Sequence, residues 1–93
     1  MKSNLLVFSG TAHIELSKNI CRYLNIKPGD AVIERFPDKE IDIKINSDVR
    51  GADVFVVQPT CAPGNEHLME LLIMIDCLRR ASAERVTAVI PYY

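Results

Sequence analysis

Short apolar runs alternate with amphipathic stretches along the chain, and this alternation predicts strands and helices in turn. Residues 4–8 (NLLVF) form a short apolar run that Ser9 and Gly10 close, which favours a buried strand. Apolar residues then recur at near-helical spacing over residues 12–24, with charged and polar residues on the other side. A helix is therefore predicted there, and Thr11 is placed to cap it.

A β-hairpin is predicted after the break at residues 27–30 (KPGD). Residues 31–35 lead into a Pro-Asp turn at 36–39, and residues 40–45 (EIDIKI) alternate strictly between charged side chains and isoleucine. Alternation with a period of two indicates a half-buried antiparallel strand. The polar residues 46–53 are expected to form a loop.

Two more strands and a second helix complete the pattern. Residues 54–57 (VFVV) lack polar alternation, which is typical of a central strand buried on both faces. Asn65 is placed to cap a helix over residues 66–83, which is apolar over most of its girth and is therefore expected to be largely buried. Residues 86–90 predict a third buried strand.

The predicted order is strand, helix, hairpin, strand, helix, strand. This order favours an α/β fold with a mainly parallel sheet flanked by helices and a protruding hairpin. Ligands of such sheets bind outside the carboxyl ends of the strands, which here are residues 9–11, 58–65 and 91–93.

Composition narrows the class of protein. A chain of 93 residues is one small domain at most, and 48% hydrophobic with 25% charged residues is ordinary for a globular protein. A net charge of −1 gives no electrostatic reason to expect nucleic-acid binding. The densest apolar run, residues 71–75, is far shorter than the ~20 residues of a membrane-spanning helix. Three cysteines without CxxC spacing indicate reduced thiols in a cytoplasmic protein rather than a disulfide framework or a metal site.

Three stretches carry candidate binding chemistry, and each also has an ordinary structural interpretation. The backbone around Ser9-Gly10-Thr11 could hold an anion, as in a flavodoxin-like phosphate loop, or it could simply form a turn and cap a helix. The nucleotide-binding motifs GxGxxG and GxxxxGK[ST] are both absent from the sequence. Phe36 beside Asp38 and Glu40 could stack on a base and accept its amino protons, or could form a plain polar turn.

Basic residues in two loops suggest a phosphate site. Arg50 lies in one loop, and Ser82 follows the second helix close to Arg79 and Arg80. These residues could bind phosphate together, or they could be ordinary surface charge. Neither His13 nor His67 lies at metal-ligand spacing from another His, Cys or carboxylate in the sequence, so both are interpreted as structural or surface residues.

Seven segments in a fixed order go further than any single motif. Together they resemble the N-terminal part of ribose-phosphate diphosphokinase, the PRPP synthetase of nucleotide biosynthesis, over essentially all 93 residues. The segments are residues 8–10, 35–40, 46–51, 57–61, 65–76, 80–83 and 87–93.

The resemblance implies a fold and an activity. The fold is that of the type I phosphoribosyltransferases, present twice in a longer chain. The activity transfers the β,γ-diphosphoryl group of ATP to the 1-hydroxyl of ribose 5-phosphate, giving PRPP and AMP, and it requires Mg²⁺. The family generally forms dimers that build hexamers.

The resemblance also implies roles for particular residues. Phe36, Asp38 and Glu40 match a hairpin that contacts the adenine of ATP in a neighbouring subunit's site. Arg50 and Ser82 match positions of an allosteric site for phosphate or ADP. Asp48 stands where many members carry serine or another neutral residue, and its carboxylate would repel phosphate.

The groups that carry the chemistry in this family lie after the part that residues 1–93 resemble. They include an Arg-Gln-Asp loop, a metal-binding histidine, a catalytic loop and a ribose-phosphate loop. We therefore expect residues 1–93 to be the N-terminal portion of the N-terminal phosphoribosyltransferase-like domain, without catalytic residues or Mg²⁺ ligands, inactive alone. The alternative is a non-catalytic regulatory or assembly subunit. Apolar surface is expected to stay exposed near residues 71–75 and 86–90.

Overall fold

Seven helices and strands follow one another in the predicted order in the computed structural model, which describes residues 4–38, 40–60 and 64–91. The resulting α/β architecture, with a mainly parallel sheet and a separate hairpin, confirms the predicted fold class. The elements are β1 (Leu5–Ser9), α1 (Ile14–Leu24), β2 (Ala31–Arg35), β3 (Ile41–Ile45), β4 (Asp53–Val57), α2 (Gly64–Arg80) and β5 (Arg85–Val89).

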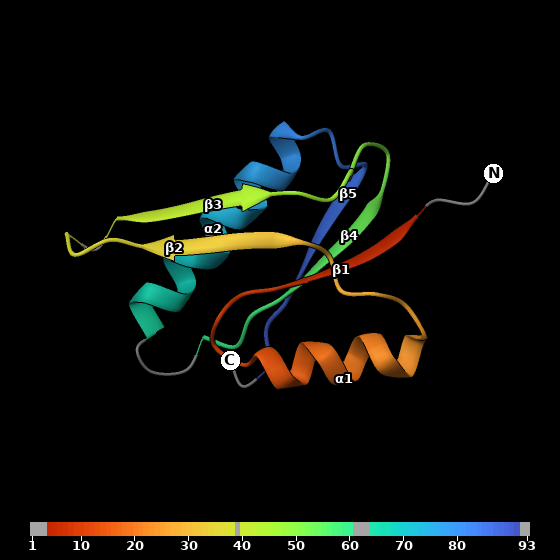
Figure 1. Ribbon diagram of the computed structural model, residues 1–93, viewed down its shortest axis with the longest axis horizontal. Coiled ribbons are helices and arrows are strands. Elements are labelled where there is room, and N and C mark those ends of the chain that lie inside the picture. The colour runs from red at the N-terminus through yellow and green to blue at the C-terminus, as the bar shows by residue number, and fades with distance from the viewer. Residues whose placement is uncertain (1–3, 39, 61–63, 92–93) are drawn as a thin grey trace.

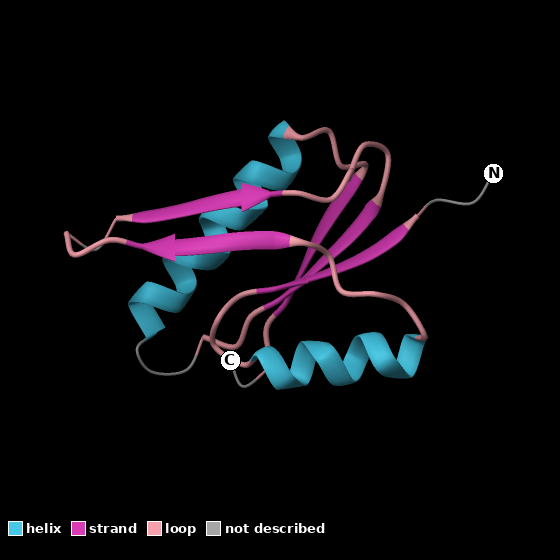
Figure 2. Ribbon diagram, in the orientation of Figure 1, coloured by secondary structure: helices cyan, strands magenta, loops and turns pink. Residues whose placement is uncertain are grey.

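The parallel sheet has the strand order β1-β4-β5, so the continuous apolar run of β4 occupies the centre, as predicted. Val7 pairs with Phe55, which in turn pairs with Thr87. Helix α1 lies on one side of this sheet, whereas α2 and the hairpin lie on the other (Figures 1 and 2). Because the three strands are parallel, they all end at the same edge of the sheet, close to the beginning of α1.

Two apolar clusters hold these layers together, one on each face of the sheet. The larger cluster joins the sheet to α2 and the hairpin, and the smaller one joins the sheet to α1. Buried members of the larger cluster are Phe8, Ile43, Val49, Ala52, Val54, Val56, Leu71, Met74 and Leu78. Those of the smaller cluster are Val7, Cys21 and Val57.

The hairpin pairs β2 with β3 in antiparallel register, with Ile33 opposite Ile43 and Arg35 opposite Ile41. Ile43 is buried and its charged neighbours Asp42 and Lys44 are exposed, which confirms the predicted alternation. The hairpin crosses over α2, and its turn extends beyond the beginning of that helix (Figure 1). The hairpin thus carries a short exposed loop away from the body of the sheet.

The predicted start of α1 was wrong by two residues, and so was its cap. The helix begins at Ile14, and His13 is the N-cap, with its Nδ1 accepting a hydrogen bond of 3.1 Å from the Leu16 N–H. Thr11 is unavailable as a cap because its N–H and its hydroxyl both donate to the carboxylate of Glu70. A tertiary acceptor therefore displaces the local capping interaction that the sequence suggests.

Helix α2 differs from the prediction at both ends. It begins at Gly64, so Asn65 lies inside its first turn instead of capping it, and it ends at Arg80. The chain leaves the helix through Ser82, whose φ of 73° is left-handed. The helix therefore ends three residues earlier than predicted, because the backbone turns at a position that hydrophobic periodicity does not indicate.

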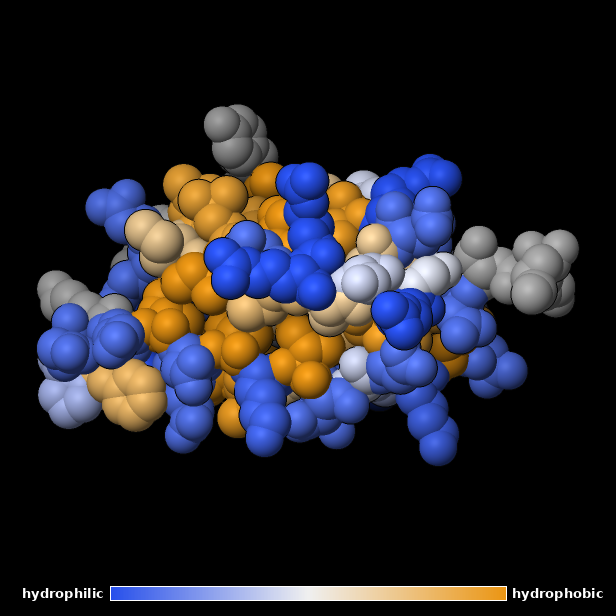
Figure 3. Space-filling view, turned by 90° about the horizontal axis from the view of Figure 1, so that it is seen from above, coloured by the Kyte–Doolittle hydropathy of each residue, from blue (hydrophilic) through white to orange (hydrophobic). Residues whose placement is uncertain are grey.

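The expectation that α2 and the last strand are buried was also wrong. One face of α2 packs on the sheet and hairpin, but Leu68, Met69 and Leu72 on the other face are 44%, 52% and 53% exposed. Strand β5 is only partly buried because it is the last strand of the described sheet. Figure 3 shows hydrophobic surface between hydrophilic residues on the face seen from above. Apolar surface is thus exposed around Leu72, in agreement with the exposed apolar surface expected near residues 71–75.

Candidate functional site

The turn of the hairpin brings together the three residues predicted to contact adenine. Phe36 is 44% exposed, and Asp38 and Glu40 are exposed beside it. The turn is ordered by its own hydrogen bonds: the Phe36 N–H donates to the Glu40 carbonyl oxygen at 2.9 Å, and the Glu40 N–H donates to Asp38 Oδ1 at 3.1 Å. Lys39 lies outside the described residues. An aromatic ring and two carboxylates are therefore presented to solvent on a shaped loop.

A buried carboxylate lies at the base of this loop. Glu70 of α2 is 0% exposed, and both of its oxygens accept hydrogen bonds. Oε1 accepts the Thr11 N–H and the Gln58 side-chain amide, the latter at 2.8 Å. Oε2 accepts the Thr11 hydroxyl at 2.9 Å and forms an ion pair with Arg35, the last residue of β2. Glu70 thus joins the hairpin to the carboxyl edge of the parallel sheet.

Gln58 extends this network under the first loop. Its side chain is 0% exposed; Oε1 accepts the Ala12 N–H at 3.1 Å, and Nε2 donates to the His67 carbonyl oxygen at 3.2 Å as well as to Glu70. Gly10 lies directly against it, because a Cβ added to Gly10 would come within 2.2 Å of the Gln58 carboxamide. Only glycine allows this close approach.

The backbone of the first loop is therefore already saturated with protein acceptors. Gly10 donates its N–H to the Val57 carbonyl oxygen at 3.1 Å, while Thr11 and Ala12 donate to Glu70 and Gln58. An anion would have to displace these acceptors. Of the two interpretations of residues 9–11, the structural turn agrees with the structure, and a flavodoxin-like phosphate loop does not.

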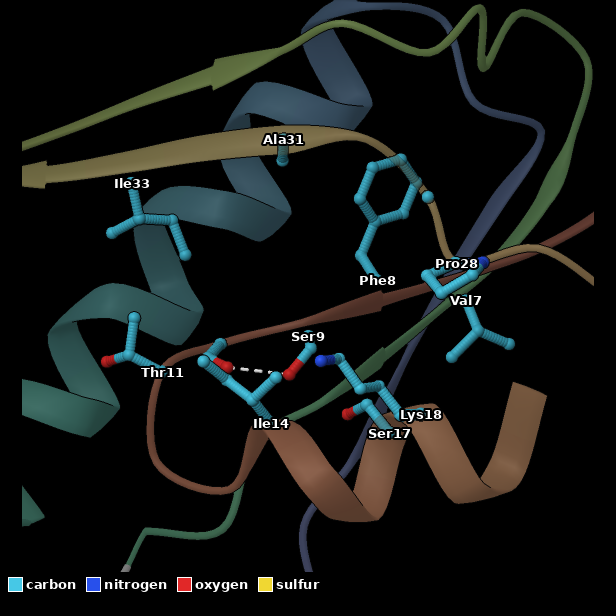
Figure 4. A pocket seen from close by; sticks show the side chains of 12 residues that line it. Val7, Phe8, Ser9, Thr11, Ile14, Ser17, Lys18, Pro28, Ala31 and Ile33 are labelled. Carbon is cyan, nitrogen blue, oxygen red and sulfur yellow. Dashed lines mark hydrogen bonds between the residues drawn. The ribbon is translucent and has the colours of Figure 1, made fainter. Parts of the chain in front are cut away.

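A half-open cavity of about 270 Å³ lies beside this loop, between α1 and the start of the hairpin (Figure 4). Its walls are largely apolar, and Phe8 and Ile33 contribute to them. Ser9 donates its hydroxyl to the Gly10 carbonyl oxygen at 2.6 Å, whereas no partner is found for the buried Ser17 hydroxyl among the described residues. The cavity has polar groups on one side only.

The two loops predicted to bind phosphate meet at the opposite edge of the sheet. The Gly51 N–H donates to the Ser82 carbonyl oxygen at 3.0 Å, which places Arg50 next to the end of α2. Asp48 Oδ1 accepts the Arg50 N–H at 3.1 Å and so shapes this turn. Arg80 forms an exposed ion pair with Asp76 at 2.9 Å. Arg50, Asp48 and Ser82 are neighbours, although 34 residues separate Asp48 from Ser82.

Other candidate chemistry is limited. Burial raises the pKa of the Cys21 thiol, and burial with the charge of Asp76 raises the pKa of the Cys77 thiol, so both stay protonated at neutral pH. Cys61, Tyr92 and Tyr93 lie outside the described residues. Within residues 4–38, 40–60 and 64–91, no three His, Cys, Asp or Glu side chains gather as metal ligands. The described helices include none that is long and apolar enough to cross a membrane.

Sequence reasoning missed the buried Glu70–Gln58 pair. The sequence does carry a signal for Glu70, because Glu70, Met74 and Leu78 recur every four residues and so share one helix face; in the structure all three are 0% exposed. A glutamate on the apolar face of a helix indicates a buried partner. Gln58 directly follows the most deeply buried strand, where a polar side chain points to a similar role.

These features define an open α/β domain whose polar groups converge at the carboxyl edge of a parallel sheet, with an exposed hairpin beside that edge. This edge is where ligands bind in such folds.

Comparison with known proteins identifies the family. The chain belongs to the family described as the N-terminal domain of ribose phosphate pyrophosphokinase, whose model matches residues 5–93. It is 56% identical over 89 residues to a ribose-phosphate pyrophosphokinase of Rhodopirellula baltica, covering 96% of this chain and 28% of that one. It is 57% identical over 90 residues to that of Haemophilus influenzae, covering 97% and 29%.

The solved structures agree with this assignment. The crystal structure of phosphoribosylpyrophosphate synthetase from Mycobacterium smegmatis matches with a TM-score of 0.95 and 43% identity, over 98% of this chain and 30% of that one. The chain thus spans less than a third of the length of the relatives it matches. The family and fold predicted from the sequence are confirmed.

Proposed function

We propose that the chain is the N-terminal portion of a ribose-phosphate diphosphokinase and that its β2–β3 hairpin binds the adenine of ATP. The exposure of Phe36 on a loop that Asp38 and Glu40 help to shape carries this proposal. An aromatic face can stack on a purine, and carboxylate oxygens accept hydrogen bonds from its amino group.

The whole reaction transfers a diphosphoryl group within nucleotide biosynthesis. The 1-hydroxyl of ribose 5-phosphate loses its proton to solvent and its oxygen forms a bond to the β-phosphorus of ATP, while the bond from that phosphorus to the α–β bridging oxygen breaks and AMP leaves with that oxygen. Such transfers depend on positioning and on neutralising phosphate charge. Within the described residues no three His, Cys, Asp or Glu side chains gather as metal ligands, and we assign the Mg²⁺ that the family requires to residues of the whole protein outside this segment. We assign to this chain adenine binding, no phosphoryl transfer of its own, and a cytoplasmic location.

The adenine site is proposed to belong to a neighbouring subunit. The turn of the hairpin extends away from the parallel sheet, which suits a contact with a second chain (Figure 1).

Arg50 and Ser82 are proposed to bind phosphate or ADP as effectors, with Asp48 weakening that binding. A non-catalytic regulatory or assembly subunit is the second candidate, and the exposed Leu68, Met69 and Leu72 favour it, because they could dock on a full-length partner.

A transplanted segment tests the proposal. Residues 1–93 replace the matching segment of the Haemophilus influenzae protein, and AMP formation from ATP and ribose 5-phosphate is measured. We expect this chimera to be active and the purified 93-residue chain to be inactive. A folded but inactive chimera would argue for the regulatory candidate, and product formation by the isolated chain would refute the predicted inactivity.

Exposed aromatic residues supply a matched pair of variants. Phe36→Ala is expected to raise the KM for ATP roughly tenfold, since base–aromatic stacking contributes about 1–3 kcal/mol, with little change in the KM for ribose 5-phosphate. Tyr23→Ala on α1 removes an aromatic side chain that is 89% exposed, and it is expected to change neither constant. Equal effects of the two variants would contradict the adenine assignment.

A further inference from the structure

The ion pair between Arg35 and Glu70 links the hairpin to α2. Arg35 ends β2 and directly precedes Phe36, whereas Glu70 lies in the second turn of α2. The side chain of Glu70 is completely buried and that of Arg35 is 34% exposed. The pair therefore lies at the base of the hairpin turn, on the side facing the sheet.

The carboxylate of Glu70 holds more than the hairpin. Thr11 of the first loop donates two hydrogen bonds to Glu70, and Gln58 donates a third from the end of β4. Arg35 Nη2 also lies 3.4 Å from the Thr11 hydroxyl. One side chain thus fixes the hairpin relative to two of the three strand ends that form the carboxyl edge.

Stability alone does not account for this arrangement. A buried ion pair contributes little net stability compared with apolar residues of the same size, and its best-attested use is to select one structural arrangement. The rest of the hairpin packs on α2 through isoleucines such as Ile33, Ile41 and Ile43. Apolar contacts are non-directional, whereas an ion pair with hydrogen bonds is directional. Arg35 Nη1 also lies 3.8 Å from the partly exposed Glu66 of the same helix, and Glu70 is in addition hydrogen-bonded to the first loop and to Gln58, so Glu70 is the partner that ties the hairpin to the sheet.

We propose that Glu70 is a positioning residue: through Arg35 it fixes the base of the β2–β3 hairpin, and it thereby orients Phe36 toward the adenine of ATP. This inference rests on the proposed function for its adenine part. It assigns a role in nucleotide binding to a side chain that does not touch the nucleotide. A small rotation at Arg35 displaces the exposed loop beyond it, and misplacement by about 1 Å can reduce activity a hundredfold.

Three variants in the chimera described above separate positioning from folding. Glu70→Gln removes the charge and keeps the size. Glu70→Asp keeps the charge, so it should restore part of the lost function. Asp76→Asn is the matched control, since it breaks an exposed ion pair of the same helix, 2.9 Å from Arg80, without touching the hairpin.

The first measurement, hydrogen–deuterium exchange, needs no activity. In Glu70→Gln we expect the amides of residues 36–45 to exchange roughly tenfold faster than in the wild type, while those of α1 change little. Asp76→Asn should leave both segments unchanged. Unchanged exchange in the hairpin, or equal acceleration in α1, would overturn the positioning role. If Glu70→Gln fails to fold, Arg35→Gln serves in its place, because Arg35 is partly exposed and lies at the end of a strand.

The second measurement is steady-state kinetics. We expect Glu70→Gln to raise the KM for ATP roughly tenfold and to leave the KM for ribose 5-phosphate within about twofold, with Glu70→Asp in between. A fall in kcat with both KM values unchanged would overturn the adenine part of the inference. A wild-type chimera without activity would refute the proposed function and this adenine part together, and the exchange measurement would still decide the role in the hairpin.

Discussion

Replacing Gly10 with alanine tests the close packing beneath the first loop. The added Cβ would lie 2.2 Å from Cδ and Oε1 of Gln58, whereas an ordinary contact begins at 3.4 Å, so Gln58 would have to move by about 1.2 Å. Its hydrogen bonds to Ala12, His67 and Glu70 measure 3.1, 3.2 and 2.8 Å. A movement of this size breaks most of them, because hydrogen bonds weaken steeply beyond ~3.2 Å.

The expected cost follows from that count. Each hydrogen bond contributes about 1 kcal/mol net, and a buried group left without a partner costs about 1–3 kcal/mol. We expect Gly10→Ala to lower the free energy of unfolding by about 2–4 kcal/mol, a large part of the ~5–15 kcal/mol of a typical domain. Urea unfolding followed by circular dichroism would show a midpoint lower by roughly 1–3 M.

A double-mutant cycle identifies the cause. In a Gln58→Ala background the carboxamide is absent, so Gly10→Ala should change the free energy of unfolding by less than ~0.5 kcal/mol. Gly51→Ala is the control, because no atom beyond its two chain neighbours lies within 4 Å of its added Cβ, whereas its φ of 71° opposes alanine. That variant should cost ~1 kcal/mol in both backgrounds. Additive effects of Gly10→Ala and Gln58→Ala would refute the reasoning.

Three further predictions concern the surface, the thiols and the proposed effector site. Leu72 is 53% exposed, so Leu72→Lys should reduce association between copies of the chain in sedimentation velocity and should lower the free energy of unfolding by less than ~0.5 kcal/mol. Met74 is buried, so Met74→Ala should lower it by about 2–4 kcal/mol. Similar losses for the two variants would contradict the assigned burial. Burial raises the pKa of the Cys21 and Cys77 thiols in the folded state. Their contribution to the free energy of unfolding is therefore complete below the pKa of ~8.5 in the unfolded chain, and it is lost as pH rises through their pKa values in the folded state. Urea unfolding between pH 7 and pH 10 should therefore show a steeper alkaline loss of stability in the wild type than in a variant with both cysteines replaced by alanine, and equal slopes would exclude this cause. Asp48→Ser in the chimera should raise the apparent affinity for inorganic phosphate, because serine keeps an acceptor for the Arg50 N–H and removes the negative charge; an unchanged phosphate response would argue against the effector site.

The sequence predicts the fold well wherever burial alone determines the pattern. Strict alternation over residues 40–45 identified β3, and the unbroken apolar run at 54–57 identified the central strand. The errors lie at helix ends and exposed faces. Thr11 was expected to cap α1, but Glu70, 59 residues further along the chain, takes its hydrogen bonds. Local preferences cannot report such a distant competitor.

The candidate site was predicted less evenly. The turn residues Phe36, Asp38 and Glu40 were named through the family resemblance, and their roles stay predictions. The network around Glu70 was not predicted: the four-residue spacing from Met74 and Leu78 places Glu70 on an apolar helix face, but the spacing does not identify the distant residues that pair with it. Its burial becomes understandable with Thr11 and Gln58, which donate hydrogen bonds to it, and with Arg35, which lies 35 residues away in the sequence and belongs to another element.

Arg35 and Phe36 are adjacent, but the side chain of Arg35 binds a buried group and that of Phe36 is exposed. This difference explains how one hairpin can be held firmly on the domain and still present a side chain for ligand binding. Arg35 turns inward to a carboxylate that is 0% exposed, whereas Phe36 remains 44% exposed at the turn. Changes at Phe36 should therefore alter ligand binding with little effect on folding, since few packed contacts are lost there. Changes at Glu70 should alter both, because its loss leaves Arg35, Thr11 and Gln58 without their shared acceptor. A comparison of stability and nucleotide binding across these two positions would separate Phe36, the residue proposed to contact adenine, from Glu70, the residue proposed to position it.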